Sequence, residues 1–245
     1  MIYSSRRAQF TTFRQLNVAL LTWNTGGVSC ANFEDYYIDF KEFFSTKSDL
    51  FVICLQEIVE LNATQIMSSD PEKRVVWDNI FMDLIEDYFE PGDYVQLVSN
   101  QLVGASLTVF VRSSLVDEIR NVEISSLKTG FGGMTGNKGS VGVRLELLEN
   151  SFCFVGSHFT AGQSAVNERV REFFSVKQDL VFPKGKRIMS HDFIFWLGDF
   201  NFRNDCDAAI AKDLTQRNNI TELLQYDQVT ILCIKNLFNL FHPFS

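Results

Sequence analysis

At 245 residues, of which 46% are hydrophobic and 21% charged, the chain has the size and composition of a single globular domain with a substantial core. Its net charge of −8 at pH 7 argues against a broad basic face that would grip nucleic acid, but a small anionic headgroup needs only a few cationic groups. The five cysteines are dispersed and no apolar stretch reaches the roughly 18 residues of a membrane span, so we expect no disulfide framework, structural zinc or transmembrane helix.

The first part of the chain predicts strands and helices in alternation. Residues 1–14 are polar and aperiodic, and are interpreted as an arm that leads into the domain. Residues 16–23 and 50–55 are apolar runs typical of buried strands. The residue spacing predicts one aromatic-rich helix within 32–44 and one amphipathic helix at 72–89.

The middle of the chain predicts a series of closely spaced strands. These strands, rich in β-branched and aromatic residues, are expected at 94–99, 105–112, 119–125, 140–148 and 152–157. A helix at 165–180, a buried strand at 192–197 and short helices between 206 and 226 follow. Adjacent strands flanked by strand–helix alternation predict an α/β fold of two packed sheets covered on the outside by helices. Loops at one end of such a sandwich carry the functional side chains.

Two polar residues that directly follow buried strands are candidate metal ligands. Asn24 leaves the first strand beside two glycines, and an amide oxygen there can coordinate a hard cation. Glu57 follows the apolar run 50–55, where a carboxylate is costly to bury unless it is paired or binds a metal. Taken singly, Asn24 is more commonly a turn residue and Glu57 a solvated carboxylate at a strand exit.

A glycine-dense stretch at 128–140 offers backbone N–H groups, hydroxyls and two lysines that can cradle phosphate oxygens. It matches neither the phosphate-loop nor the dinucleotide-binding pattern, and a flexible hairpin loop is the alternative. His158, one of three histidines, ends an apolar strand, where a histidine is more commonly structural.

The segment 196–203 is the strongest single candidate. Asp199, Asn201 and Arg203 alternate after a buried strand, so extended chain would present all three on one face. A carboxylate to orient water, an amide to hold a phosphate oxygen and a guanidinium to neutralise charge suit phosphoryl hydrolysis. The sequence has no G-x-S-x-G elbow and no cysteine in a phosphate-cradle motif, so metal-assisted attack by water is the expected mechanism.

Together these segments resemble the ordered motifs of the inositol polyphosphate 5-phosphatases, and the synaptojanin branch in particular. The resemblance runs in register from about residue 17 to residue 226 and rests on 23–27, 56–57, 135–139, 157–158 and 196–203. It implies a four-layer α/β/β/α sandwich of the endonuclease/exonuclease/phosphatase superfamily. It also implies Mg²⁺-dependent removal of the 5-phosphate from phosphatidylinositol 4,5-bisphosphate and related headgroups at a membrane surface.

The resemblance also implies a role for each matching residue. Glu57 would be the main Mg²⁺ ligand with Asn24 beside it, while Asp199 would orient the attacking water. His158 would contact the scissile phosphate, and Asn201 would bind the water or a phosphoryl oxygen. The expected headgroup-binding residues are Lys128, Thr135, Asn137, Lys138 and Arg203, and lipid contact is expected of Phe131, Met134 and Phe159.

Three later motifs of this family are not found in the sequence: a Tyr-Lys segment that reads the 4-phosphate, a Pro-Ala-Trp-x-Asp-Arg segment and a Ser-Asp-His segment. We therefore expect a catalytic domain at 15–228 that is incomplete at its C-terminal end, and a divergent apolar tail at 229–245. Removing members of a cooperative catalytic set typically lowers the rate on the order of 10³-fold or more, so low turnover is expected.

Two alternative functions remain open. One is a non-catalytic phosphoinositide-binding fragment, and the less favoured one is a superfamily nuclease. The expected partners are a phosphoinositide headgroup and, peripherally, a membrane surface, with no nucleic acid. The absence of a secretory signal predicts a cytoplasmic location with peripheral membrane association.

Overall fold

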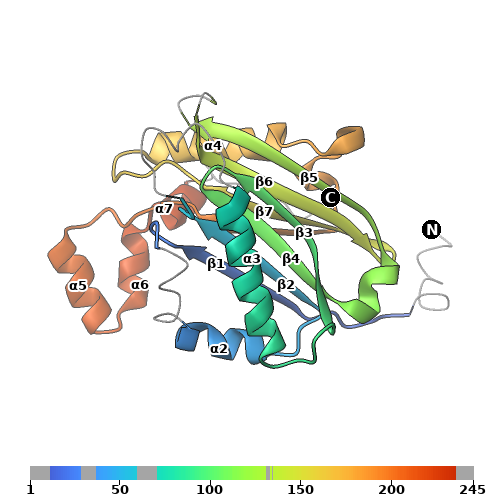
Figure 1. Cartoon of the computed structure of the whole chain (residues 1–245). Coiled ribbons are helices and arrows are strands. Elements are labelled where there is room, and N and C mark those ends of the chain that lie inside the picture. The colour runs from blue at the N-terminus through green and yellow to red at the C-terminus, as the bar shows by residue number, and fades with distance from the viewer. Residues whose placement is uncertain (1–11, 29–36, 60–70, 131–132, 134, 236–245) are drawn as a thin grey trace.

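The computed structural model describes residues 12–28, 37–59, 71–130, 133 and 135–235, whose strands form two four-stranded sheets packed face to face (Figure 1). The first sheet has the order β1-β2-β4-β3, with bounds Val18–Asn24, Leu50–Gln56, Ala105–Arg112 and Tyr94–Leu102. In it β1 and β2 are parallel, whereas β4 runs antiparallel to both β2 and β3.

The second sheet has the order β5-β6-β7-β8, with bounds Ile119–Gly130, Thr135–Leu147, Asn150–His158 and Phe193–Asp199. Its last pair, β7 and β8, is parallel, and its other pairs are antiparallel. Each sheet therefore ends in a parallel pair that includes an edge strand, β1 in the first sheet and β8 in the second.

The main core lies between the two sheets. Alternate residues of β2 (Leu50, Val52, Cys54) face this core, while Phe51, Ile53 and Leu55 face the outside of the first sheet. In β7, Phe152 and Phe154 face the other sheet, while Cys153 and Val155 face outward into a third apolar cluster. Strands buried on both faces read as continuous apolar runs, which explains why the sequence shows no alternation there.

Helices cover the outer faces of both sheets. Helices α2 (Tyr37–Ser45) and α3 (Pro71–Glu86) cover the first sheet, with Phe44, Trp77 and Phe81 in their shared cluster. Helices α4 (Val166–Asp179) and α7 (Gln228–Ile234) cover the second sheet through Phe173, Val176 and Leu232. The predicted four-layer α/β/β/α architecture is therefore confirmed.

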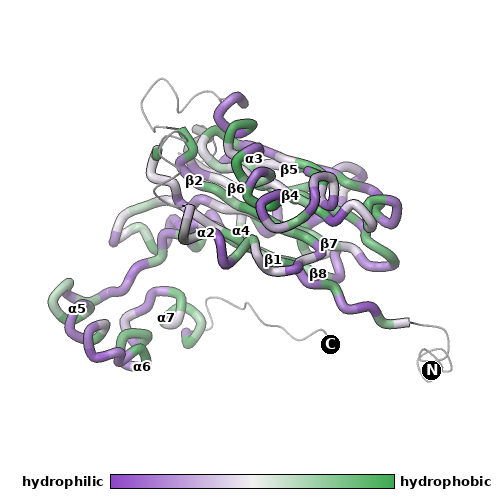
Figure 2. The backbone as a smooth tube through the Cα atoms, turned by 60° about the horizontal axis from the view of Figure 1, so that its bottom comes forward, coloured by the Kyte–Doolittle hydropathy of each residue, from purple (hydrophilic) through white to green (hydrophobic). Residues whose placement is uncertain are grey.

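Shorter helices complete the chain. Helices α5 (Ala208–Gln216) and α6 (Ile220–Leu223) stand apart from the sandwich in both views (Figures 1 and 2). The 3-10 turns among the described residues are η4 (Ser113–Glu118), η6 (Pro183–Gly185), η7 (Ile188–Ser190) and η8 (Leu224–Tyr226). Within the described ranges, no helix is both long and apolar enough to cross a membrane.

The predicted elements agree with the observed ones except in two regions. Strand 105–112 was predicted with its observed bounds, and helix 165–180 differs by one residue at each end. In the glycine-dense stretch 128–140, β5 runs to Gly130 and β6 begins at Thr135, with these two residues paired, while residues 131, 132 and 134 lie outside the description. Helix α7 begins at Gln228 and continues past the domain end predicted at residue 228. The position of that domain end stays a prediction.

Candidate functional site

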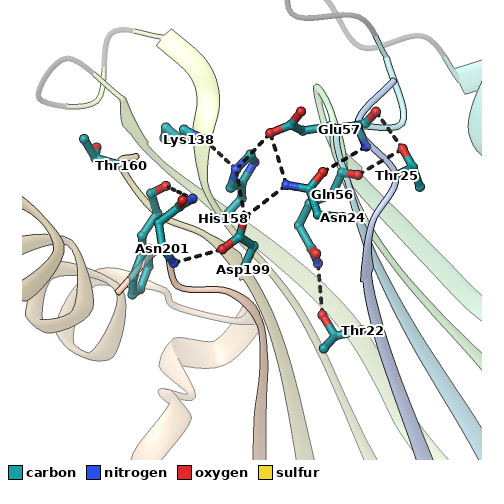
Figure 3. Close-up of polar contacts among 12 residues, drawn as sticks. Thr22, Asn24, Thr25, Gln56, Glu57, Lys138, His158, Thr160, Asp199 and Asn201 are labelled. Carbon is teal, nitrogen blue, oxygen red and sulfur yellow. Dashed lines mark hydrogen bonds and ion pairs between the residues drawn. The ribbon is translucent and has the colours of Figure 1, made fainter. Parts of the chain in front are cut away.

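Four strands that end together bring the predicted site residues to one end of the sandwich (Figure 3). Asn24 is the last residue of β1, and Glu57 follows the last residue of β2. His158 and Asp199 end β7 and β8 and lie opposite each other in the ladder. Because both pairs are parallel, their carboxyl ends meet, and residues distant in the sequence converge.

The backbone at Glu57 is in the left-handed region, with φ +56°. This conformation costs a residue other than glycine about 1–3 kcal/mol, so the surroundings must hold it. Its carbonyl accepts hydrogen bonds from Thr25 Oγ1 at 2.8 Å and from Gly27 N at 2.9 Å. The turn after β1 thus fixes the point at which the chain leaves β2, and turns the Glu57 side chain toward Asn24 and His158 (Figure 3).

Asn24 joins the two carboxylates of the site. Its Nδ2 donates to Glu57 Oε1 at 3.1 Å and to Asp199 Oδ2 at 3.0 Å, which links the first sheet to the second. Its Oδ1 accepts from Gly26 N at 2.9 Å. As placed, the Asn24 amide nitrogen supports both carboxylates, while Oδ1, which accepts one hydrogen bond from Gly26 N, keeps a second lone pair that could coordinate a cation.

His158 lies between these carboxylates and Lys138. Its Nε2 is 3.6 Å from Glu57 Oε1, 3.8 Å from Asp199 Oδ2 and 2.5 Å from Lys138 Nζ. Burial, together with the adjacent Lys138 charge, lowers the pKa of His158 to about 4, so the ring is neutral at pH 7. Burial also lowers the pKa of Lys138, which the charges of Glu57 and Asp199 partly offset. A neutral Nε2 therefore accepts from the Lys138 ammonium.

The segment after β8 is not extended, which corrects the predicted alternation of Asp199, Asn201 and Arg203. Asn201 has φ +55°, because Asp199 Oδ1 accepts from its backbone N at 2.9 Å and bends the chain. The Asn201 side chain is buried, donating to Phe159 O at 3.0 Å and accepting from Arg203 Nη2 at 2.6 Å. The three predicted residues are thus connected by hydrogen bonds instead of lying on one strand face.

Two pockets flank the convergent residues. A pocket of 660 Å³, called the polar pocket, lies between the β5–β6 hairpin and α4, and its lining carries charges of both signs: Lys128, Lys138 and Arg171 with Glu168 and Glu172. A second pocket of 510 Å³ has an aromatic lining and reaches Asp199 and Asn201. The convergent residues therefore adjoin one pocket lined mainly by polar side chains and one lined mainly by aromatic side chains.

The residues present fit a hard divalent cation. The side chains of Glu57 and Asp199 are both 28% exposed, and both accept from the same amide beside a neutral imidazole. Mg²⁺ is usually held by one or two carboxylates, together with water and phosphate oxygens. Among the residues described, no three or more histidine, cysteine, aspartate or glutamate side chains are grouped so that they could hold a metal ion by themselves, so a cation here would take further ligands from water or phosphate.

Some predicted residues lie away from this centre or outside the description. Lys128 is on the polar pocket, with its side chain exposed. Thr135 and Asn137 lie in β6, but their side chains are outside the described set, as are Phe131 and Met134. Phe159 is fully buried in the outer core of the second sheet, so the lipid contact predicted for it is wrong.

Glu172, a buried residue of α4, was missed by sequence reasoning. It accepts from Thr160 N at 2.7 Å, Thr160 Oγ1 at 2.9 Å and Thr129 Oγ1 at 2.8 Å, which ties α4 to β5 and to the segment after His158. The sequence offers no local signal for Glu172, because an acidic residue on an amphipathic helix normally faces solvent.

Comparison with known proteins agrees with this geometry. The profile described as Endonuclease/Exonuclease/phosphatase family 2 matches residues 21–242. Human Synaptojanin-2 is 35% identical over 244 residues, which cover 93% of this chain and 16% of that protein. Inositol-1,4,5-trisphosphate 5-phosphatase 1 of Schizosaccharomyces pombe is 33% identical over 225 residues, covering 91% of this chain and 21% of that protein.

A solved structure is similar along almost the whole chain. It is the inositol polyphosphate 5-phosphatase domain of SPsynaptojanin in complex with inositol (1,4)-bisphosphate and calcium ion, with 28% identity and a TM-score of 0.82. The similarity covers 96% of this chain and 67% of that one. This chain therefore spans about two thirds of the solved domain and less than a quarter of the two curated relatives.

Proposed function

Because the chain belongs to the endonuclease/exonuclease/phosphatase family as a synaptojanin-type inositol polyphosphate 5-phosphatase domain, we propose that it hydrolyses the 5-phosphate of phosphatidylinositol 4,5-bisphosphate and related inositol phosphates. The observation that carries the proposal is the meeting of Asn24, Glu57, His158 and Asp199 at four strand ends, with Lys138 bonded to the histidine. Two carboxylates, a neutral imidazole and an ammonium can together bind a phosphate and activate water.

Asp199 is the proposed residue for orienting the attacking water. One of its oxygens accepts from Asn201 N and the other from Asn24 Nδ2, which fixes the plane of the carboxylate. Each carboxylate oxygen can accept more than one hydrogen bond, so an acceptor position remains for a water proton. The ring of His158 lies 3.8 Å away, next to the place where a phosphoryl group would lie against that water.

Lys138 and Arg203 are the proposed phosphate-binding cations. Lys138 uses one of its three N–H donors on His158, which leaves two for phosphoryl oxygens. Arg203 is anchored to Asn201 by one nitrogen, so its other donors can reach a second oxygen. Both the nitrogen and the oxygen of the Asn201 side-chain amide are already hydrogen-bonded. We therefore assign Asn201 the role of positioning Asp199, through its backbone N, and Arg203.

Glu57 is the proposed ligand of a divalent cation, taken to be Mg²⁺, with Asn24 and Asp199 beside it. A bound cation would supply charge neutralisation to the phosphate and a lowered pKa to a coordinated water. The calcium ion named with the SPsynaptojanin domain supports a divalent site in this family.

The polar pocket of 660 Å³ is the proposed space for the inositol headgroup. It adjoins Lys138, and Lys128 and Arg171 lie on its lining. The inositol (1,4)-bisphosphate named with the SPsynaptojanin domain supports a ligand of this class. Acting on a lipid headgroup would bring the domain into peripheral contact with a membrane surface, in the cytoplasm.

The test is phosphate release from vesicles that contain phosphatidylinositol 4,5-bisphosphate, with Mg²⁺ or with excess chelator. In keeping with the low turnover expected from the sequence, we expect slow Mg²⁺-dependent release, which falls further, on the order of 10³-fold, in Asp199→Asn. Asp192→Asn is the matched control, since Asp192 adjoins the other end of β8 and accepts from Ser151. Release that is equal in the two variants would contradict the assignment of Asp199.

The same protein samples distinguish the alternatives. Binding to these vesicles without any phosphate release would favour a phosphoinositide-binding module over an enzyme. Release from soluble inositol phosphates, measured in parallel, separates lipid preference from headgroup preference. Nicking of supercoiled plasmid DNA would instead favour a nuclease.

A further inference from the structure

Gln228, the first residue of α7, is a buried amide at the junction of four chain segments. It is 2% exposed, and its Oε1 accepts from Arg203 N at 2.9 Å and from Arg169 Nη2 at 2.6 Å. Its Nε2 donates to Asp205 Oδ1 at 2.7 Å and to Gln163 O at 3.1 Å. An amide side chain has two donor hydrogens and two acceptor lone pairs, so the hydrogen-bonding capacity of Gln228 is fully used.

One arm of this junction leads to the candidate water-orienting carboxylate. Gln228 holds the backbone of Arg203, whose guanidinium donates to Asn201 Oδ1 at 2.6 Å. Asn201 in turn donates from its backbone N to Asp199 Oδ1 at 2.9 Å. Since Asn201 is in the left-handed region and outside any regular strand or helix, its position depends on these bonds together with its donation to Phe159 O at 3.0 Å.

The second arm leads to the segment after His158. Arg169, which is 0% exposed, donates from Nη1 to Thr160 O at 3.1 Å and to Gly162 O at 2.7 Å. The same guanidinium bonds Gln228 Oε1 and lies over the Phe202 ring at 5.2 Å. Gln228 therefore fixes the segments after β7 and after β8 relative to each other.

We propose that Gln228 is a positioning residue that sets the place of Asn201 and Asp199 through Arg203. A residue that only anchored α7 would act through packing, as Leu232 does in the outer core of the second sheet. The catalytic consequence rests on the proposed function, whereas the effect on Asn201 can be measured without any turnover.

The test is amide hydrogen exchange, measured by NMR on the whole chain. Gln228→Met keeps the unbranched side chain and removes its four side-chain hydrogen bonds, while the backbone bond from Gln228 N to Arg203 O at 3.0 Å remains. Leu232→Ala weakens the packing of the same helix and leaves all of these bonds in place. Relative to the amides of β6 and β7, we expect exchange at Asn201 N to rise at least about tenfold in Gln228→Met and to stay unchanged in Leu232→Ala. Unchanged exchange at Asn201 in Gln228→Met, or an equal rise in both variants, would overturn the proposal.

A second variant guards against loss of folding. Gln228→Glu, combined with Asp205→Asn to remove charge repulsion, keeps the acceptor for Arg203 N and Arg169. We expect it to retain protection at Asn201, and loss of that protection would contradict the assigned path from Gln228 through Arg203 to Asn201.

In the phosphate-release assay, Gln228→Met should lower kcat about 10²-fold with little change in KM. A wild-type chain that releases no phosphate would refute the proposed function, while the exchange result would still decide the role of Gln228.

Discussion

Gly198, one residue before Asp199, is the position where a single methyl group should disturb the site most. It lies in β8 with φ +135°, a conformation that residues with a side chain rarely adopt. A Cβ atom at Gly198 would lie 2.0 Å from the carbonyl oxygen of Ser157 and 2.7 Å from its nitrogen. Both atoms belong to the backbone of β7, paired with Gly198, so no side-chain rotation can relieve the contact.

The expected destabilisation has two parts. The unfavourable backbone conformation contributes about 1–3 kcal/mol, and overpacking of a closed contact typically adds a similar amount, about 1–3 kcal/mol. Gly198→Ala should therefore lower the free energy of unfolding by about 2–6 kcal/mol. A domain with the usual total of about 5–15 kcal/mol would remain folded in most of that range. In the folded variant, β8 must move away from β7, which separates Asp199 from His158.

Urea unfolding measures the loss, and Gly185→Ala is the matched control. Gly185 also has positive φ, +73°, but its Cβ would meet nothing within 4 Å. The Gly185→Ala control therefore loses only the conformational part, about 1–3 kcal/mol. Equal unfolding midpoints for the two variants would refute the reasoning. A Gly198→Ala protein that kept full phosphate release would refute the link to the site.

Three further predictions concern the metal, the buried thiols and the last described helix. Glu57→Gln should weaken Mg²⁺ binding at least about tenfold in titration calorimetry, whereas Glu118→Gln, on an exposed ion pair, should not. Burial raises the pKa of Cys54 and of Cys153 from the ordinary 9.0 to about 12. The protonated thiols therefore stabilise the fold fully below pH 9, and this contribution to stability is lost as the pH rises toward 12. Above pH 9, each thiol should lower the unfolding free energy by about 1.4 kcal/mol per pH unit, and an unchanged slope in Cys153→Ala would contradict this. Asp227→Ala removes the cap that accepts from Thr230 N and should cost about 0.5–2 kcal/mol in urea unfolding; an unchanged midpoint would show that α7 does not need its cap.

The layers could be predicted from the sequence because buried strands and helix faces require apolar residues in recognisable runs and spacings. Strand β2 is apolar at every position but its last, since alternate residues pack between the sheets and against α2 and α3. Glu57 and Asp199 became candidates because each is a carboxylate at the end of an apolar strand, and their roles came from the resemblance to the family motifs; those roles stay predictions. The sequence predicted only that such loops lie at one end of the sandwich; the structure brings Glu57, which follows β2 of one sheet, close to Asp199, which ends β8 of the other.

Features that depend on a single backbone angle were not predictable in this way. Period-two alternation placed Asn201 on one face with Asp199, but the Asp199 carboxylate accepts from Asn201 N and turns the chain instead. Gln228 gave no signal either, since its partners lie 25 residues away at Arg203 and 59 residues away at Arg169. A polar residue at the start of a helix is normally solvated, and only the tertiary fold buries this one.

The geometry of the site depends on apolar residues as much as on polar ones. Asn24 donates one hydrogen bond to Glu57, which follows a strand of the first sheet, and one to Asp199, which ends a strand of the second sheet. The spacing of the two sheets therefore sets the distance between the two carboxylates. That spacing is maintained by the core between the sheets, which includes Leu197, two residues before Asp199. Misplacing a catalytic group by 1 Å can cost about 10²-fold in rate. Relatives that keep every polar motif residue can therefore still differ in activity, because the packing between the sheets can differ. The motif residues identify the chemistry, while the core sets the distances between the reacting groups.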